Sequence, residues 1–446
     1  MHASMINLDL TPDLIIENGR MLTPAGWSEG GYLTIVAGKI AEMGSGPAPL
    51  ELHRLAKQVI SADGMAVLPG LINAHTHLSQ TFMRGLSAGR SLERWLKELI
   101  WPLQDAMNLE ELRLAALLGM IENLHSGVTH VVDHQKITKS LDFSLAVCAA
   151  AEDCGMRLTM ARAWTDKGAT AEYPEYILSE LRTLFESQRD NPLIKIASGP
   201  LTPLRATART LQQSHALAQE YHCVTHLHVS ETRNEVKMSL EETGMRPITW
   251  LDSLGALGPN TQLVHAVWLD NDEIRLIKER GASVVHCPVS NAVLASGMAP
   301  IDEMQQAGVR ILLGTDGPAS NDNQDSFENM KMALCVARLR SLDASQLAPA
   351  EVIGMATGGK TLMSGEAADV ILVNLRNVNA APVLDIDSAL VLCCHSSDVD
   401  TVIVNGKVVL LQKRIPGMDE AALIKECEQA AKALLKRAKF PPALMT

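Results

Sequence analysis

The sequence has little positive charge for its length of 446 residues. It contains 39 Lys and Arg against 51 Asp and Glu, so its formal net charge at pH 7 is −12. Because phosphate binding needs clusters of basic side chains, we expect no nucleic acid partner. No apolar run reaches about 18 residues, so we expect no membrane-spanning helix. A signal peptide is not expected either, because Asp9, Asp13 and Glu17 stand where one would be apolar.

Paired cysteines are also missing. Eight cysteines are scattered along the chain, and none forms a Cys-x-x-Cys motif. In a chain of this length, that pattern favours reduced thiols and a cytoplasmic location. The content of hydrophobic residues is 47% and that of charged residues is 20%, which is typical of a globular protein with one large domain and a smaller one.

The middle of the chain alternates apolar, strand-like runs with segments that are apolar at helical spacing. The strand-like runs cover residues 67–75, 127–133, 157–164, 194–200, 224–229, 261–267, 282–288 and 310–316. Eight strand–helix units predict a (β/α)₈ TIM barrel. A doubly wound open sheet is the alternative, and it is disfavoured because no Gly-rich phosphate loop follows the first run.

Both ends of the chain contain short β-strand patterns. In the C-terminal part, Asn405-Gly406 between two apolar runs predicts a hairpin. We expect residues 67–366 to form the barrel. The flanking segments, residues 1–66 and 367–446, are expected to form one small β-sandwich, with a terminal helix in the second segment. An amphipathic helix is predicted over residues 419–438, with its basic residues on the solvated face.

Histidines and acids gather where the predicted barrel strands end. His75 and His77 are two residues apart in an extended run, so their side chains point to the same face. Other strand ends contribute His226, His228, Glu231, His265, His286 and Asp316. A single buried histidine is most simply part of the core. So many at one face of five strands predict a metal centre, because the carboxyl ends of barrel strands meet there.

Four sequence stretches resemble the amidohydrolase superfamily. They are residues 69–77, 226–232, 286–291 and 314–322. Within the superfamily, the chain resembles the branch that contains deaminases of guanine, 8-oxoguanine and isoxanthopterin, deaminases of S-adenosylhomocysteine, and triazine hydrolases. The resemblance covers nearly the whole chain and implies a (β/α)₈ barrel with a β-sandwich built from both termini.

The resemblance also implies roles for individual residues. It implies that the metal ligands are His75, His77, His228 and Asp316, and that the catalytic residues are Glu231, His265 and Asp316. Three imidazoles and one carboxylate leave a position open for water, as in catalytic zinc sites. Glu231 matches the proton shuttle, which takes a proton from water and passes it to the leaving nitrogen. His265 matches the histidine that orients the water.

One divalent metal ion is expected. Members of the superfamily with two ions usually hold them through a carboxylated lysine at the end of the fourth strand. In this chain Lys195 lies at the beginning of that strand, and its end contains no lysine. Zn²⁺ is favoured by the nitrogen-rich ligand set, and Fe²⁺ is possible.

The predicted substrate contacts are Gln80, Trp164, His286 and Ser320. An amide such as Gln80 offers a donor and an acceptor to a lactam edge, although it can also be a simple loop residue. Trp164 can stack on a flat ring or belong to the core. His286 can touch the substrate or bind a backbone carbonyl. We expect His226 to support a ligand rather than to bind the metal.

The expected reaction is hydrolytic deamination of an amino-substituted heteroaromatic base, such as an oxidised purine, a guanine-like base or a pterin, with release of ammonia. Nucleoside-type relatives have a ribose-binding Glu where this chain has Gln104, which favours a free base. The alternatives are hydrolysis of s-triazines, including dechlorination, and deamination of nucleosides such as S-adenosylhomocysteine. The resemblance also implies a homo-oligomer. The connection over residues 356–367 is about ten residues shorter than in similar proteins, through trimming or through an omitted stretch.

Overall fold

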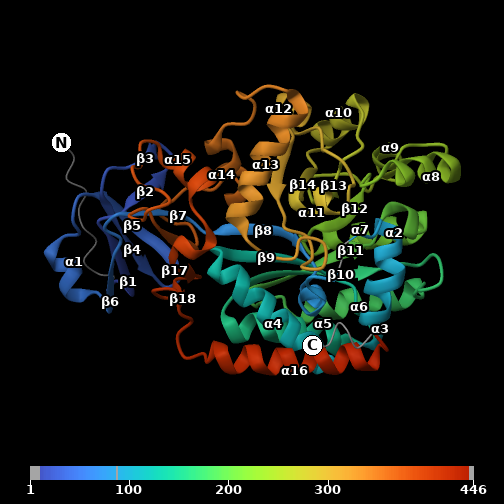
Figure 1. The fold of residues 1–446 in the computed structure, drawn as a ribbon, viewed down its shortest axis with the longest axis horizontal. Helices are drawn as coiled ribbons and strands as arrows, with labels where there is room; N and C mark the ends of the chain where they lie inside the picture. The colour runs from blue at the N-terminus through green and yellow to red at the C-terminus, as the bar shows by residue number, and fades with distance from the viewer. Residues whose placement is uncertain (1–10, 87–88, 441–446) are drawn as a thin grey trace.

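The computed structural model describes residues 11–86 and 89–440. An eight-stranded parallel sheet with helices packed around it forms the larger part of the molecule (Figure 1). Its strands, in spatial order, are β8 (Leu71–Thr76), β9 (Val128–Gln135), β10 (Arg157–Trp164), β11 (Ile194–Pro200), β12 (Thr225–Val229), β13 (Thr261–His265), β14 (Ser283–His286) and β15 (Arg310–Leu313). The ring closes beyond β15, where the N–H of Asp316 donates to the carbonyl of His75 at 2.9 Å. The predicted (β/α)₈ barrel is confirmed.

Helices alternate with these strands, as expected for parallel neighbours that need crossover connections. They are α4 (Leu109–His125), α5 (Leu141–Cys154), α6 (Pro174–Ser187), α7 (Ala208–Glu220), α8 (Arg233–Thr243), α9 (Pro247–Ser253), α10 (Asn271–Arg280), α11 (Pro288–Val293), α12 (Ile301–Gln306), α13 (Ser326–Ser341) and α14 (Pro349–Thr357). A 3-10 turn, η1 (Leu78–Met83), and helices α2 (Leu92–Trp95) and α3 (Trp101–Ala106) lie between β8 and α4.

The run predicted over residues 67–75 is two strands rather than one. Gly70 separates β7 (Met65–Pro69), which belongs to another sheet, from the barrel strand β8. A Cβ at Gly70 would lie 2.1 Å from the side chain of Thr129, so only glycine allows the chain to pass this close to β9. The chain changes sheets at this glycine, which continuous hydrophobicity does not reveal.

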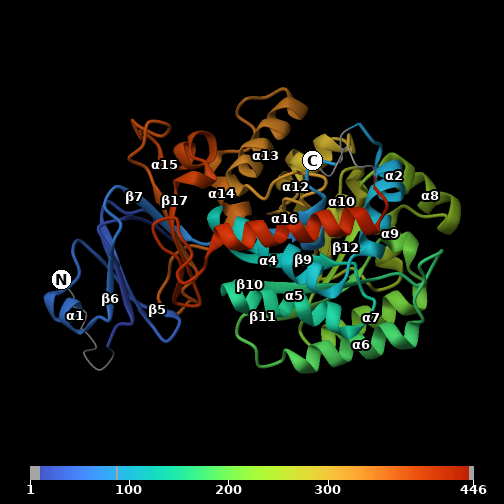
Figure 2. The same cartoon turned by 60° about the horizontal axis from the view of Figure 1, so that its bottom comes forward.

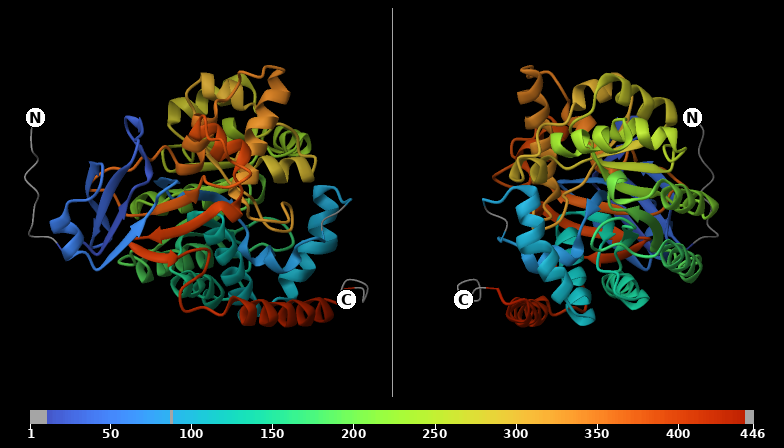
Figure 3. Two further views of the ribbon diagram at one scale, coloured as in Figure 1. Left: turned by 60° about the vertical axis from the view of Figure 1, so that its left-hand side comes forward. Right: turned by 90° about the vertical axis from the view of Figure 1, so that its right-hand side faces the viewer.

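Two further sheets are built from the ends of the chain, the first from N-terminal strands alone and the second from strands of both ends. One has the order β5 (Lys39–Ser45), β4 (Gly31–Val36), β1 (Leu14–Glu17), β6 (Gln58–Ser61). The other has the order β18 (Lys407–Leu410), β17 (Val399–Val404), β16 (Val370–Asn374), β7, β2 (Arg20–Thr23), β3 (Gly26–Trp27). A buried apolar cluster that includes Leu33, Val67 and Ile403 joins them. The predicted β-sandwich from both termini is therefore confirmed (Figure 3).

The C-terminal elements agree with the sequence pattern. β17 and β18 form a hairpin through Asn405 and Gly406, whose φ angles are 50° and 75°. The last helix, α16 (Glu420–Arg437), packs on α4 and buries Leu423, Cys427 and Leu434 (Figure 2). Among the described residues, no helix has the length and apolar character needed to cross a membrane.

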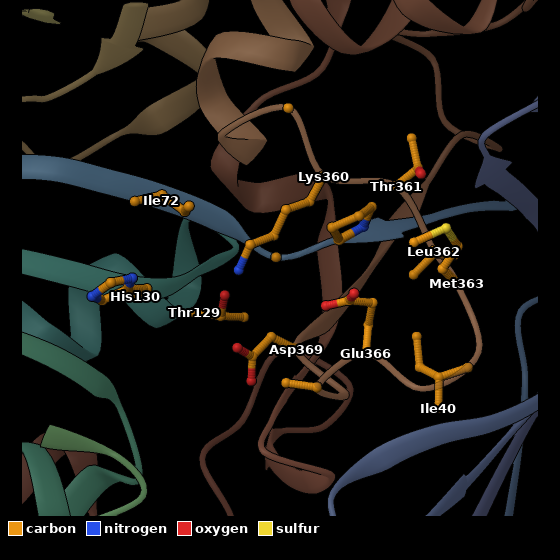
Figure 4. Close-up of a pocket in the computed structure, with 14 residues that line it drawn as sticks. Ile40, Ile72, Thr129, His130, Lys360, Thr361, Leu362, Met363, Glu366 and Asp369 are labelled. Atoms are coloured by element: carbon orange, nitrogen blue, oxygen red, sulfur yellow. The ribbon is translucent and has the colours of Figure 1, made fainter. Parts of the chain in front are cut away.

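The short connection after α14 is tied to the sandwich. It leaves α14 through Gly358, whose φ is 68°, and the N–H of Ile40 donates to the carbonyl of Glu366 at 2.9 Å. A cavity opens here, at the amino end of β8 and β9. Figure 4 shows Lys360 and Glu366 of the connection opposite Thr129 of β9. The histidines described next lie at the other end of the barrel.

Candidate metal centre and active site

Four of the predicted ligand atoms meet at the carboxyl end of the barrel. Nε2 of His75 and Nε2 of His77 each lie 3.4 Å from Oδ1 of Asp316. Nε2 of His228 lies 3.3 Å from Nε2 of His77. Ligands placed about 2.0–2.1 Å from a tetrahedral zinc ion are separated by about 3.3–3.4 Å. These separations match the edges of such a tetrahedron, so the residues fit a zinc-sized ion.

Each of these imidazoles is oriented through its other ring nitrogen. Nδ1–H of His77 donates to the carbonyl of His134 at 2.8 Å, and Nδ1–H of His228 donates to the carbonyl of Leu201 at 2.9 Å. Nε2 of each ring therefore carries the lone pair that a metal ligand needs. Nε2 of His75 is buried without a hydrogen-bond partner among the described residues, which a bound ion would correct.

His226 orients His75. Nδ1–H of His226 donates to Oε1 of Gln262 at 2.9 Å, and this leaves Nε2 of His226 to accept from Nδ1–H of His75 at 2.8 Å. The relay runs from Gln262 through His226 to His75. Its polarity fixes the tautomer of His75 with Nε2 unprotonated. This is the supporting position that we expected for His226.

The electrostatic environment favours neutral imidazoles and an ionised carboxylate. Burial, followed by the charges of neighbouring imidazoles, lowers the pKa of His228 well below its ordinary value. The pKa of His75 is also well below its ordinary value, with burial as the largest cause. Burial opposes ionisation of Asp316, but the contact with His75 and the nearby imidazoles hold the pKa of Asp316 well below its usual range. These are the protonation states that metal ligands require.

Asp316 occupies a strained turn that several polar groups support. Its φ is 62°, which is uncommon for a residue other than glycine. The N–H of Gly317 donates to Oδ1 at 2.6 Å, and the hydroxyls of Ser290 and Ser320 donate to Oδ2 at 2.6 and 3.0 Å. Ser320 is fully buried behind this carboxylate. The structure therefore directs the hydroxyl of Ser320, a predicted substrate contact, toward the carboxylate of the candidate ligand Asp316.

Glu231 and His265 lie beside the ligand set. The hydroxyl of Ser296 donates to Oε1 of Glu231 at 2.8 Å, while Oε2 of Glu231 lies 3.8 Å from Nε2 of His265. Nδ1–H of His265 donates to Oδ1 of Asn291 at 2.9 Å. His265, His75 and Asp316 also place ligand atoms within 4.8 Å of one another. A carboxylate oxygen and an imidazole nitrogen are thus directed toward the same place as the ligands.

Gln80 and His286 have unused polar atoms at the site. Oε1 of Gln80 is buried without a partner among the described residues, and a Cβ on Gly317 would lie 2.0 Å from it. Both ring nitrogens of His286 are likewise buried and unpartnered. Burial, with the charge of His265, lowers the pKa of His286 to about 3. The imidazole of His286 and the amide oxygen of Gln80 can therefore form hydrogen bonds with a polar ligand.

Trp164 does not lie inside the barrel. In the register of β9 and β10, Ala161 pairs with His134, whose ring packs 4.7 Å from that of His228 inside the barrel. Side chains alternate along β10, so Trp164 is on the outer face with Arg162. It is fully buried in the main core, and its indole N–H donates to Ser198 at 3.2 Å. The structure thus supports packing, the alternative to ring stacking that the sequence left open.

Two features of the site are not evident from the predicted motifs. His134, just past the predicted end of the second strand, packs against His77 and His228. An amide network also supports the turn at Asp316: Oδ1 of Asn73 accepts the N–H of Thr315 at 3.0 Å, and Nε2 of Gln324 donates to the carbonyl of Asp316 at 3.2 Å. The buried Asp133-His134 pair at a strand end was a signal for the first feature. No sequence motif predicts the contact between Asn73 and Gln324, which lie far apart in the chain.

Comparison with known proteins agrees with this site. The model of the Amidohydrolase family matches residues 66–409, most of the chain. The chain belongs to the amidohydrolase family. Members are metal-dependent, and this protein is a hydrolase that acts on C–N bonds.

Similar curated proteins are named as deaminases. One is a 5′-deoxyadenosine deaminase of Methanothermobacter thermautotrophicus, 34% identical over 430 residues, which are 94% of this chain and 98% of that protein. Another is a 5-methylthioadenosine/S-adenosylhomocysteine deaminase of Caldanaerobacter subterraneus, 35% identical over 391 residues, which are 85% of this chain and 89% of that protein.

Solved structures share the fold. An adenosine deaminase from Xanthomonas campestris with bound zinc is 30% identical, has a TM-score of 0.88, and covers 95% of this chain and 99% of its own. An atrazine chlorohydrolase from Arthrobacter aurescens has the same TM-score and is 24% identical. The match covers 94% of this chain and 100% of the chlorohydrolase chain, and at this identity it shows only that the fold is shared.

Proposed function

We propose that this amidohydrolase is a zinc-dependent hydrolytic deaminase of adenine nucleosides that are altered at the 5′ position. The position of Glu231 carries the proposal: its carboxylate lies beside the metal ligands, where a proton acceptor for water and a proton donor for departing ammonia are needed. The names of similar proteins that cover 94% and 85% of this chain support the nucleoside class.

One metal ion would be held by His75, His77, His228 and Asp316. Such an ion supplies Lewis-acid chemistry, which lowers the pKa of water toward neutrality. We propose a single ion because β11 ends in Ser198-Gly199-Pro200 and its only lysine, Lys195, is exposed near its start. Zn²⁺ suits the three imidazole nitrogens, and Fe²⁺ is the alternative.

The chain's own groups move the protons. The oxygen of water adds to C6 of the adenine ring, and Glu231 accepts one proton from that water. The addition opens the C6=N1 double bond and places its electron pair on N1. Glu231 then protonates the amino nitrogen, the bond between C6 and that nitrogen breaks, and ammonia leaves as the electron pair on N1 re-forms the ring double bond. The remaining hydroxyl proton moves to N1, which gives an inosine-type product. Nε2 of His265, 3.8 Å from Oε2 of Glu231, faces the attacking oxygen and restricts its direction. The unpaired atoms of Gln80 and His286 are proposed to bind polar edges of the ring.

This proposal replaces the expectation of a free base. That expectation depended on Gln104, which stands where nucleoside-type relatives have a carboxylate. The carbonyl of an amide also accepts a hydrogen bond from a ribose hydroxyl, so Gln104 does not exclude a nucleoside. Deamination of a free base is nevertheless the second candidate, because the amide weakens the charge-assisted binding that a carboxylate provides.

Ammonia release by the zinc-loaded protein tests the proposal. We expect turnover of 5′-deoxyadenosine, 5′-methylthioadenosine and S-adenosylhomocysteine, with much weaker turnover of adenine, guanine, 8-oxoguanine and isoxanthopterin. Turnover of free bases alone would support the second candidate. Chloride release from chlorinated triazines, with no ammonia from any of these compounds, would contradict both.

A further inference from the structure

A second buried carboxylate lies behind Glu231. Glu235 is in the first turn of α8, four residues after Glu231, and its Oε2 accepts the backbone N–H of Glu231 at 2.8 Å. The N–H of Ser230 also interacts with this carboxylate. The other oxygen, Oε1, is buried and has no hydrogen-bond partner among the described residues.

The contact differs from ordinary helix capping. Thr232 is the N-cap of α8, and its hydroxyl accepts the N–H of Glu235 at 3.2 Å. In a capping box, the acidic side chain at this helix position would return to the N–H of the N-cap residue. Here the carboxylate of Glu235 reaches one residue further back and binds Glu231 instead. Helix capping therefore does not account for its placement.

The segment that Glu235 holds is a strained turn. Ser230 has a φ of 50°, and this turn carries the chain from β12 to α8. The carbonyl of Ser230 accepts the N–H groups of Val267 and Trp268 at 3.1 and 2.9 Å. The loop after β13 thus fixes one side of the peptide and Glu235 fixes the other. A strained backbone needs such support to persist.

We propose that Glu235 is a positioning residue that fixes the backbone at Glu231, so that the carboxylate of Glu231 is aimed at the reacting water. The hydroxyl of Ser296 binds the carboxylate of Glu231, and the carboxylate of Glu235 binds the backbone N–H of Glu231. Burial raises the pKa of Glu235 to about 7, so a neutral side chain of the same shape is tolerated there. The inference rests on the proposed deaminase function for its kinetic test.

Three variants test the proposal in the zinc-loaded protein. Glu235→Ala removes the acceptor. Glu235→Gln keeps an oxygen that can accept the same N–H groups. Glu241→Ala is the matched control, because Glu241 lies on the same helix, is 64% exposed and pairs only with Lys237 among the described residues.

We expect Glu235→Ala to lower kcat about 10- to 100-fold, because a displacement of about 1 Å in a reacting group costs that much. KM should change less than about threefold and one zinc ion should stay bound. Glu235→Gln should recover most of kcat, and Glu241→Ala should match the wild type. A kcat within twofold of wild type in Glu235→Ala, a Gln variant as slow as the Ala variant, or loss of zinc in Glu235→Ala would each overturn the proposal.

Hydrogen exchange gives a readout that does not depend on the reaction. In the peptide over residues 228–236, Glu235→Ala should speed exchange of the protected amides about 5- to 10-fold, as expected for one lost hydrogen bond. The Gln and Glu241 variants should exchange like the wild type. Unchanged exchange in Glu235→Ala would overturn the positioning role. A wild-type protein that releases no ammonia would instead contradict the proposed function and leave the exchange result valid.

Discussion

The two ends of the barrel contain buried or partly buried histidines whose ring nitrogens are used differently. At the carboxyl end, His75, His77 and His228 use Nδ1 for fixed hydrogen bonds and leave Nε2 free to meet at one point. At the amino end, His130 bonds through Nε2 to the hydroxyl of Thr159 at 2.8 Å. Burial lowers the pKa at both ends. A histidine shielded from solvent is therefore not by itself a site, and the convergence of unpaired ring nitrogens is what distinguishes the candidate metal centre.

Exchanging one histidine at each end for alanine should give the largest contrast. His228→Ala removes one of four ligands, so we expect loss of bound metal and of all measurable activity. His130→Ala should keep the full metal content and a kcat near that of wild type. Metal content and ammonia release are measured for both variants. Loss of metal from His130→Ala would contradict the claim that only the histidines at the carboxyl end bind metal.

Glu231→Gln should be the next largest effect. The amide keeps the size of the side chain but cannot accept and return a proton, so kcat should fall about 10²- to 10⁴-fold. Metal content and thermal stability should be unchanged, since Glu231 touches Ser296 and His265 rather than the ligand tetrahedron. A variant that retained more than a tenth of wild-type kcat would show that Glu231 is not the proton carrier.

Titration of His130 should affect stability alone. Burial, with the positive charges of Arg157 and Lys360, lowers its pKa to about 4 in the folded state, against about 6.5 when unfolded. The unfolded chain therefore binds more protons between these values, and stability falls as the pH is lowered from about 6.5 to 4. From pH 7 to pH 5 this group should cost about 2 kcal/mol. Urea unfolding at both pH values should show a correspondingly smaller loss in His130→Gln; an equal loss in variant and wild type would refute this assignment.

Ser296→Ala should lower activity less than Glu231→Gln. It removes one hydrogen bond from Oε1 of Glu231 and leaves the carboxylate in place. A fall in kcat of about 5- to 20-fold is expected, in line with one hydrogen bond to a charged group. KM and metal content should not change. Steady-state kinetics on the zinc-loaded variant measure this, and an increase in KM at constant kcat would assign Ser296 to substrate binding.

The barrel could be predicted closely because its signals are local. The runs at residues 157–164 and 194–200 coincide with β10 and β11, since buried parallel strands are continuously apolar. The change of sheet at Gly70 was missed because it depends on contact with Thr129, more than fifty residues away.

The candidate ligand residues could be placed by their positions at strand ends, and a supporting role could be expected for His226, but the ligand that His226 supports could not be predicted. His226 orients His75 because β12 lies across the barrel from β8, and no sequence interval encodes that distance. The side chain of Ser320 contacts Asp316 and that of Trp164 contacts Ser198, and the sequence did not reveal this because the direction of a side chain depends on register and turn geometry. The alternation of side chains along β10 could have predicted that Trp164 points away from the barrel interior.

Zinc titration of the metal-free protein tests the central claim most directly. Ammonia release from 5′-deoxyadenosine is measured as zinc is added, in the wild type and in His228→Ala. The four-ligand site predicts activity that rises linearly and saturates at one zinc ion per chain, with none in the variant. Full activity without metal, or saturation only at two ions per chain, would contradict this account.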